Sequence, residues 1–218
     1  MIESTLVNAT IGFVKKQLEN AEGGHDWFHI ERVYKLALRI AEAEANVDVL
    51  VVQLAALLHD IADSKFNGGD ETIGPRIARE FLTEQQLPEY QLEQVIAIIE
   101  NISFKGGNQA QTVFSKELAV VQDADRLDAI GAIGIARTFN YGGFKNRALY
   151  DPAIAPNLHL SKEEYKSSTA PTLNHFYEKL LRLKDLMHTE TARKLAAERH
   201  QFMEQFLSRF YAEWEGEA

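Results

Sequence analysis

The sequence predicts an all-α protein, and three observations support this class. Nearly every long segment spaces its apolar residues at intervals of three and four, as the buried face of a helix requires. Almost none of them alternates apolar and polar residues in the manner of a strand. The chain has 218 residues, 45% of them hydrophobic, and no linker rich in Pro, Gly or Ser divides it. We therefore expect one domain over residues 1–218, an irregular bundle of about eight to ten helices.

The first three predicted helices lie within residues 1–63. Apolar spacing over residues 6–18 indicates the first, which Gly23-Gly24 would end. The second covers about residues 30–41. Asp48 is expected to cap the third, VLVVQLAALLHDIAD, which is apolar on nearly all sides and should therefore be the buried central helix.

The remaining helices follow with one long interruption. Small residues at Gly131 and Gly134 predict close helix packing in AIGAIGIARTF. The longest irregular stretch is predicted to run from Tyr141 to Ser161. The further helices are expected at about 71–86, from Pro88 to 102, at about 115–130, 162–187 and 190–214.

Composition excludes several classes of site and partner. The absence of Cys excludes disulfides, thiolate catalysis and Cys-based zinc sites, so any metal must be held by His, Asp and Glu. A net charge of −9 argues against duplex nucleic acid as a partner, because phosphate backbones are normally met by a basic surface. The N-terminus lacks the features of a signal peptide, and no apolar run approaches the length of a membrane span. We expect a cytoplasmic protein without a membrane partner.

A polar pair at the end of the apolar third helix is the first candidate site. His59 and Asp60 would need compensation there, since an unpaired buried charge is very costly, and a metal ion is one way to provide it. The other interpretation is a core histidine with its hydrogen bonds satisfied, beside an aspartate that caps the helix. These two residues alone leave both interpretations open.

A second candidate is the acidic group in QDADRLDAI. Asp123, Asp125 and Asp128 lie between strongly apolar flanks, which is unusual for a merely solvated helix face. Asp125 and Asp128 would share one face of a helix, whereas Asp123 would point roughly 160° away from Asp125. Imidazole and carboxylate ligands would suit Mn²⁺, Fe²⁺, Co²⁺, Ni²⁺ or Zn²⁺, and spacing does not distinguish among these ions.

Three motifs in order resemble the HD-domain metal-dependent phosphohydrolases. HDWFHIERV, LLHDIAD and QDADRLDAIGAIGIAR look most like a compact bacterial subgroup, over about residues 23–151. The resemblance implies an HD-type helical domain with the C-terminal helices, about 161–214, packed on it. It also implies that the metal ligands are His29, His59, Asp60 and Asp125.

The resemblance favours one divalent ion. Binuclear members of the superfamily have further histidines between the HD pair and the last aspartate, and residues 61–124 contain none. Mn²⁺ is favoured, with Ni²⁺, Co²⁺, Fe²⁺, Zn²⁺ and Mg²⁺ as alternatives.

Several neighbours of these ligands could complete a site, each with a simpler alternative. Asp63 stands near a catalytic acid of the related guanosine-tetraphosphate hydrolases, although Ser64 replaces the second acid, and it could equally be a surface carboxylate. Lys65 could meet a phosphate or be solvated. Arg32 shares a helical face with His29 and could bind substrate or form a structural ion pair. Arg126 points about 100° away from Asp125, which favours a structural salt bridge.

Other residues are expected to support the ligands or the substrate. Asp128, one turn after Asp125, is placed to orient a ligand histidine. Asp26 is predicted to cap the second helix, with His25 as a neighbouring or pocket-lining group, so His25-Asp26 is not the HD pair. Lys145 and Arg147 belong to a segment with glycines and an aromatic ring, which could close over a nucleotide or be an ordinary surface loop.

The expected function is therefore metal-dependent hydrolysis of a small phosphorylated substrate, a nucleotide. The nearest subgroup implies cleavage of (deoxy)nucleoside triphosphates to monophosphate and pyrophosphate. Nucleoside monophosphate phosphatase or phosphodiesterase activity is the alternative within this class. A sensor that binds metal and nucleotide without catalysis is the alternative of another class.

Overall fold

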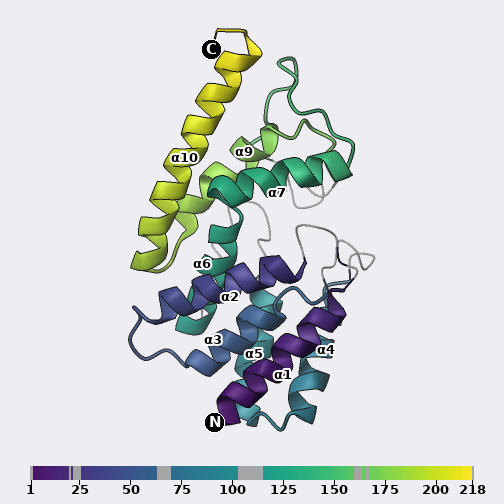
Figure 1. The fold of residues 1–218 in the computed structure, drawn as a ribbon, viewed down its shortest axis with the longest axis vertical. Helices are drawn as coiled ribbons and strands as arrows, with labels where there is room; N and C mark the ends of the chain where they lie inside the picture. Colours follow the sequence, from purple (N-terminus) through teal and green to yellow (C-terminus); the bar gives the residue numbers. More distant parts are fainter. Residues whose placement is uncertain are drawn as a thin grey trace. The chain divides into compact units, whose positions relative to one another are not determined.

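The computed structural model is all-α. Within the residues that it describes, it contains nine α-helices and no strand (Figure 1). The predicted fold class is therefore confirmed. None of the described helices is both long and apolar enough to cross a membrane. The described residues are 2–19, 21, 26–62, 70–102, 115–159, 164 and 167–217.

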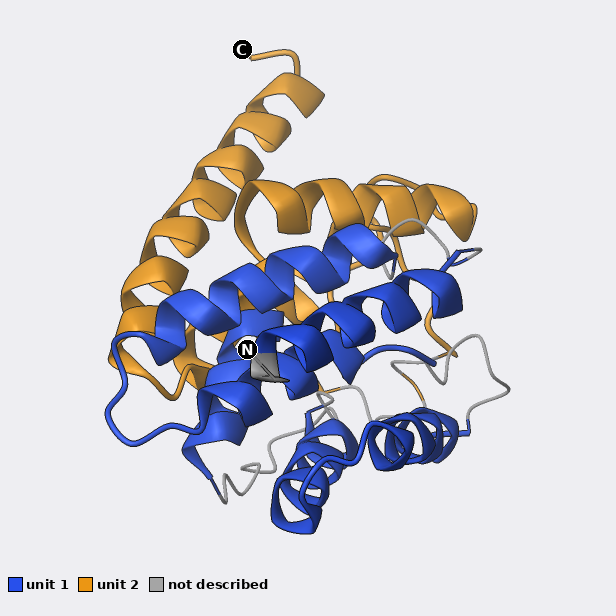
Figure 2. Ribbon diagram, turned by 60° about the horizontal axis from the view of Figure 1, so that its bottom comes forward, with its two compact units in different colours: residues 1–104, 112–125 blue, residues 105–111, 126–218 orange. Residues whose placement is uncertain are grey.

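The chain forms two compact units, with the boundary between Asp125 and Arg126 (Figure 2). Unit 1 contains the first five helices and most of the sixth. Their bounds are α1 Ile2–Gln17, α2 Trp27–Ala41, α3 Val49–Leu58, α4 Ile73–Glu84, α5 Glu89–Asn101 and α6 Lys116–Asp128.

Helix α3 is the buried centre of unit 1, as its apolar sequence predicts. Every residue from Leu54 to Leu58 is fully buried, and α1, α2 and α5 pack against it. The Asp48 carboxylate caps its N-terminus by accepting from the amides of Leu50 and Val51. The same carboxylate accepts from the Gln91 side chain of α5, so the cap also ties the two helices together.

Unit 2 contains the C-terminal helices. Phe139, Phe176 and Phe206 form the centre of an aromatic cluster there, with Phe139 5.9 Å from Phe206 and Phe176 5.7 Å from Phe206 between ring centroids. The bounds of its helices are α7 Gly131–Phe144, α9 Asn174–Glu178, the 3₁₀ helix η2 Leu180–Leu186 and α10 Glu190–Trp214.

Two boundaries in unit 2 differ from the sequence prediction. Tyr141 to Phe144 form the last turn of α7 rather than the start of an irregular stretch. Gly142 is buried there against the Thr172 side chain, where a Cβ atom would clash. Gly142 therefore serves close packing, whereas a Cβ atom at Gly143 would meet nothing within 4 Å.

The second difference is the helix predicted at about 162–187, which is replaced by the short helices α9 and η2. Pro171 disfavours a helical conformation of the residue before it. The amides of Thr172 and Leu173 then donate to the carbonyls of Ala148 and Leu149, so they cannot take part in a helix that continues from residue 168.

Candidate metal centre

His29 is placed by the N-terminus of α2. The side chain of Asp26 accepts from the His29 amide at 3.1 Å and caps the helix, as the sequence predicts. His29 thereby stands in the first turn, where it is buried. Its ring Nε2 is the atom that meets the other candidate ligands.

His59 and Asp60 follow immediately after the last residue of α3. The Nδ1 atom of His59 lies 2.9 Å from the carbonyl oxygen of Ala56, to which it donates. That carbonyl belongs to the last turn of α3, whose final four carbonyls have no partner within the helix. The bond fixes the ring and leaves the Nε2 lone pair free for a metal, an arrangement that usually strengthens such a ligand.

Three ligand atoms converge, with a fourth beside one of them, all within unit 1. The two Nε2 atoms of His29 and His59 are 3.3 Å apart. The Asp125 Oδ1 atom, from α6, lies 3.6 Å from the first and 3.8 Å from the second. The Asp60 Oδ2 atom lies 3.8 Å from Nε2 of His29. Residues from three helices that are far apart in sequence are thus brought to one point.

The separations of 3.3 and 3.6 Å fit a first-row divalent ion, and the two of 3.8 Å are slightly longer than such an ion requires. Imidazole and carboxylate ligands lie about 2.0–2.2 Å from such an ion, which places neighbouring ligand atoms roughly 3.0–3.6 Å apart. His29, His59 and Asp125 offer three atoms that all lie within 4.8 Å of one another, with Asp60 beside His29. A set of two imidazoles and two carboxylates suits a divalent ion of intermediate softness better than a hard ion that binds only oxygen ligands.

The cluster is open on its carboxylate side. The side chains of His29 and His59 are 2% and 4% exposed, whereas those of Asp60 and Asp125 are 17% and 33% exposed. A substrate from solvent would therefore approach past Asp125. Asp123, two residues earlier in α6, is fully buried.

The carbonyl of Ala56 is the one contributor that sequence analysis missed. The sequence offered Asp128 as the group that orients a ligand histidine. The structure shows the carboxylate of Asp128 accepting from Arg137 at 2.8 Å within unit 2, while the backbone of α3 orients His59. The only signal in the sequence was a histidine one residue beyond the end of an apolar helix.

Arg32, Lys145 and Arg147 lie in the described part of the chain. Arg32 is in α2, one turn after His29, and is half-buried. In unit 2 the cations of Lys145 and Arg147 each lie 5.7 Å from the ring centre of Tyr141, and Arg147 also donates to the Ser168 carbonyl.

Arg126 is held inside unit 2 by two acceptors. It is buried and donates to the Leu186 carbonyl and to His188. Three further predicted residues, His25, Asp63 and Lys65, lie outside the described part of the chain.

Comparison with known proteins identifies the family. Residues 27–130, which contain all four candidate ligands, match the HD domain family. The uncharacterized protein YpgQ of Bacillus subtilis is 41% identical over 198 residues, with 89% of this chain and 87% of YpgQ covered. The chain belongs to the HD domain family.

Solved structures of HD proteins agree with this assignment over nearly the whole chain. An HD-superfamily hydrolase from Bacillus thuringiensis is 44% identical with a TM-score of 0.76, and 98% of each chain is covered. A structure from Lactobacillus plantarum is 38% identical with a TM-score of 0.86 and covers 97% of this chain and 98% of its own. YpgQ has been solved in complex with ADP, at 37% identity and a TM-score of 0.78, with 98% of this chain and 97% of YpgQ covered.

Membership of the HD family indicates what the cluster would bind and what reaction the protein catalyses. HD domains bind divalent metal ions, and the His/Asp group of this chain is a candidate site of this kind. The chain is an enzyme of the HD superfamily, a metal-dependent phosphohydrolase.

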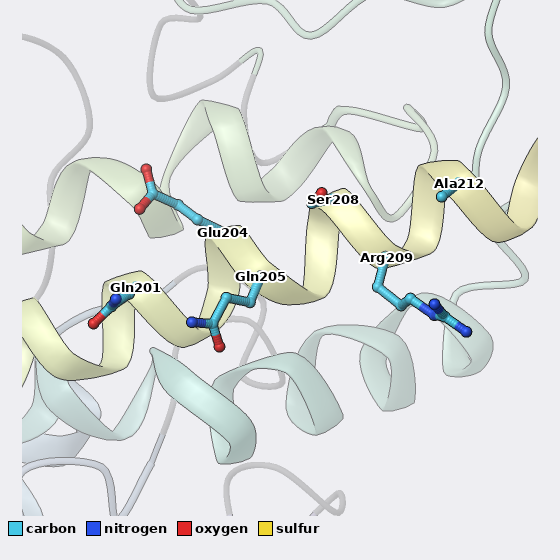
Figure 3. Close-up of a pocket in the computed structure, with 6 residues that line it drawn as sticks. All are labelled: Gln201, Glu204, Gln205, Ser208, Arg209 and Ala212. Atoms are coloured by element: carbon cyan, nitrogen blue, oxygen red, sulfur yellow. The ribbon is translucent and has the colours of Figure 1, made fainter. Parts of the chain in front are cut away.

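A separate feature of unit 2 is a shallow groove on α10 (Figure 3). All of its lining side chains come from one helix and are mostly exposed, and none of the predicted site residues is among them. The lining residues are Gln201, Glu204, Gln205, Ser208, Arg209 and Ala212.

Proposed function

We propose that this enzyme hydrolyses (deoxy)nucleoside triphosphates to the monophosphate and pyrophosphate with one bound divalent ion, Mn²⁺ in preference to others. The observation that carries the nucleotide assignment is the ADP complex of YpgQ, a relative that aligns over 98% of this chain. A nucleotide in that relative makes a phosphorylated nucleoside the first substrate class to test here.

The ligands of the ion would be His29, His59, Asp60 and Asp125. Each imidazole presents its Nε2 atom to the cluster, and the two carboxylates lie at the open edge of the cluster. When bound, a divalent ion supplies Lewis acidity toward a phosphate oxygen and makes water a better nucleophile at neutral pH. No cysteine competes for the ion, since the chain contains none.

The remaining roles are assigned to residues near these ligands in sequence or to the cationic segment of unit 2. Asp63 would orient the attacking water or protonate the leaving group. Lys65 and Arg32 would neutralise charge on the phosphate oxygens, which increases in the transition state. Lys145 and Arg147 stay predicted substrate contacts, and His25 and Asp128 stay predicted supporting residues.

Product analysis tests the reaction directly. Wild-type protein is incubated with each common nucleoside mono-, di- and triphosphate and Mn²⁺, and the products are separated by ion-exchange chromatography. Monophosphate with pyrophosphate supports the proposal, whereas orthophosphate from a monophosphate supports the phosphatase alternative. Binding without turnover of any nucleotide would support a sensor and contradict the proposal.

A matched pair of variants ties the activity to the cluster. Asp60→Ala removes a candidate ligand and is expected to abolish turnover. Asp185→Ala removes an exposed aspartate of η2 and is expected to leave turnover unchanged. Activity that survives Asp60→Ala would contradict a role for this cluster.

A further inference from the structure

We propose that the ring of Phe28 is the surface on which the nucleotide base stacks, and so determines the preference for nucleotides over other polyphosphates. This inference rests on the proposed function and assigns a base contact to the same site. It concerns a residue that holds no metal and carries no charge.

Phe28 is anomalous in its surroundings. It lies in the first turn of α2, directly before the candidate ligand His29. It is 62% exposed, although His29 and Ile30 beside it are buried. The preceding aromatic residue, Trp27, is half-buried and has the ammonium group of Lys15 4.6 Å from its ring centre. Sites that bind small molecules are lined predominantly by apolar and aromatic side chains, which makes an exposed ring directly before a candidate metal ligand a candidate ligand contact.

Helix geometry places this ring on the face of α2 that flanks the His29 face. Successive residues of a helix are about 100° apart around the axis and about 1.5 Å apart along it. Side chains also lean toward the N-terminus of their helix. Phe28 therefore projects beside His29, outside the core and toward the open end of α2. A nucleotide with its phosphates at the cluster could reach the ring with its base.

The candidate ligands themselves offer the base no aromatic ring to stack on, because their imidazoles would bind the ion. The candidate ligands are two imidazoles committed to the ion and two carboxylates, and carboxylates offer a base no apolar surface. Stacking on an aromatic side chain is available to every base, because each has a π-face. An enzyme whose base contact is Phe28 would accept several bases and reject phosphate chains that carry none.

Unit 1 offers a matched control for exposure. Tyr90, at the start of α5, is 63% exposed, almost the same fraction as Phe28, but it is not adjacent to any candidate ligand in sequence. An effect of general surface hydrophobicity would appear at both residues. An effect of base stacking would appear only at Phe28.

The experiment separates base from phosphate binding. KM and kcat for dATP with Mn²⁺ are measured for wild type, Phe28→Ala, Phe28→Leu, Phe28→Trp and Tyr90→Ala. Inorganic tripolyphosphate, which has the phosphate chain without a base, is measured as a competitive inhibitor of each. We expect Phe28→Ala and Phe28→Leu to raise KM for dATP about tenfold. We expect kcat and the inhibition constant of tripolyphosphate to stay within twofold of wild type, because the cluster is untouched.

The other variants sharpen the test. Phe28→Trp should keep the wild-type KM because it keeps a π-face, and Phe28→Leu shows whether apolar bulk alone suffices. Tyr90→Ala should match wild type. An unchanged KM in Phe28→Ala overturns the inference, as does an equal loss of affinity for tripolyphosphate. If wild type cleaves no nucleoside triphosphate, the proposed function fails. Calorimetric binding of ADP with Mn²⁺ then decides the inference, through a loss in Phe28→Ala that Tyr90→Ala does not show.

Discussion

The Nε2 atoms of His29 and His59 lie 3.3 Å apart, although thirty residues separate the two histidines along the chain. The pair forms because one ring stands in the first turn of α2 and the other just beyond the end of α3, two helices that pack against each other. The carboxylate of Asp125, a residue of α6, lies close to both rings. The position of each of these three side chains thus depends on a different helix.

Removing one of these rings should remove the metal. We expect His29→Ala to lose the stabilisation that Mn²⁺ gives the wild type, which is about 2.7 kcal/mol when the ion is at a hundred times its dissociation constant. The measurement is the rise in melting temperature with Mn²⁺ concentration. His159→Ala, at an exposed histidine of unit 2, should keep the full rise. A full rise in His29→Ala would remove this histidine from the ligand set.

The sequence predicts the parts of this fold that repeat an unambiguous local pattern. Asp48 before a ten-residue apolar run predicts the cap and the buried helix α3, and both are confirmed. Asp26 before the first turn of α2 is confirmed in the same way. In both cases a short polar side chain precedes apolar residues, and the bond it makes is to an amide two or three residues away.

The errors come from residues whose effect depends on distant partners. Gly142 resembles a hinge in sequence, but its missing side chain is what lets α7 approach Thr172, thirty residues later. Pro171 sits within a segment of amphipathic spacing and interrupts it, after which the backbone pairs with residues 148 and 149. The carbonyl of Ala56, which orients His59, belongs to the backbone and so leaves no trace in residue type.

The cap at Asp26 provides a prediction that concerns both stability and metal binding. We expect Asp26→Ala to lower the free energy of unfolding by about 1 kcal/mol, because the amide of His29 loses its acceptor. The affinity for Mn²⁺ should fall as well, since the first turn that carries His29 frays. Asp26→Asn keeps an acceptor oxygen and should lie near wild type. Urea unfolding with and without Mn²⁺ measures both effects, and equal stability of the Ala and Asn variants would contradict the cap.

Asp48 should cost more to remove, because it makes two kinds of contact. Its carboxylate accepts from the amides of Leu50 and Val51 and from the side chain of Gln91. We expect Asp48→Ala to lower the free energy of unfolding by about 2–3 kcal/mol, the sum of a cap and a hydrogen bond to a charged group. Gln91→Leu removes only the second contact and should cost about 1 kcal/mol. Equal losses in urea unfolding of the two variants would show that the cap contributes nothing.

Tyr211 gives unit 2 a characteristic response to alkali. Burial, and then the hydrogen bond between its hydroxyl and that of Tyr177 at 3.1 Å, raise its pKa well above the usual value near 10. The folded protein therefore keeps this proton at a pH where the unfolded chain releases it. The contribution to stability is complete below pH 10 and declines as the pH rises above 10, toward the raised pKa of the folded state.

Replacing Tyr211 by Phe should remove that decline. Between about pH 10 and pH 11.5 the urea midpoint of wild type should fall more steeply than that of Tyr211→Phe, because the variant has no proton to release at this site. Tyr90→Phe removes an exposed hydroxyl from unit 1 and should keep the wild-type slope. Parallel slopes for wild type and Tyr211→Phe above pH 10 would show that the buried phenol does not couple ionisation to folding.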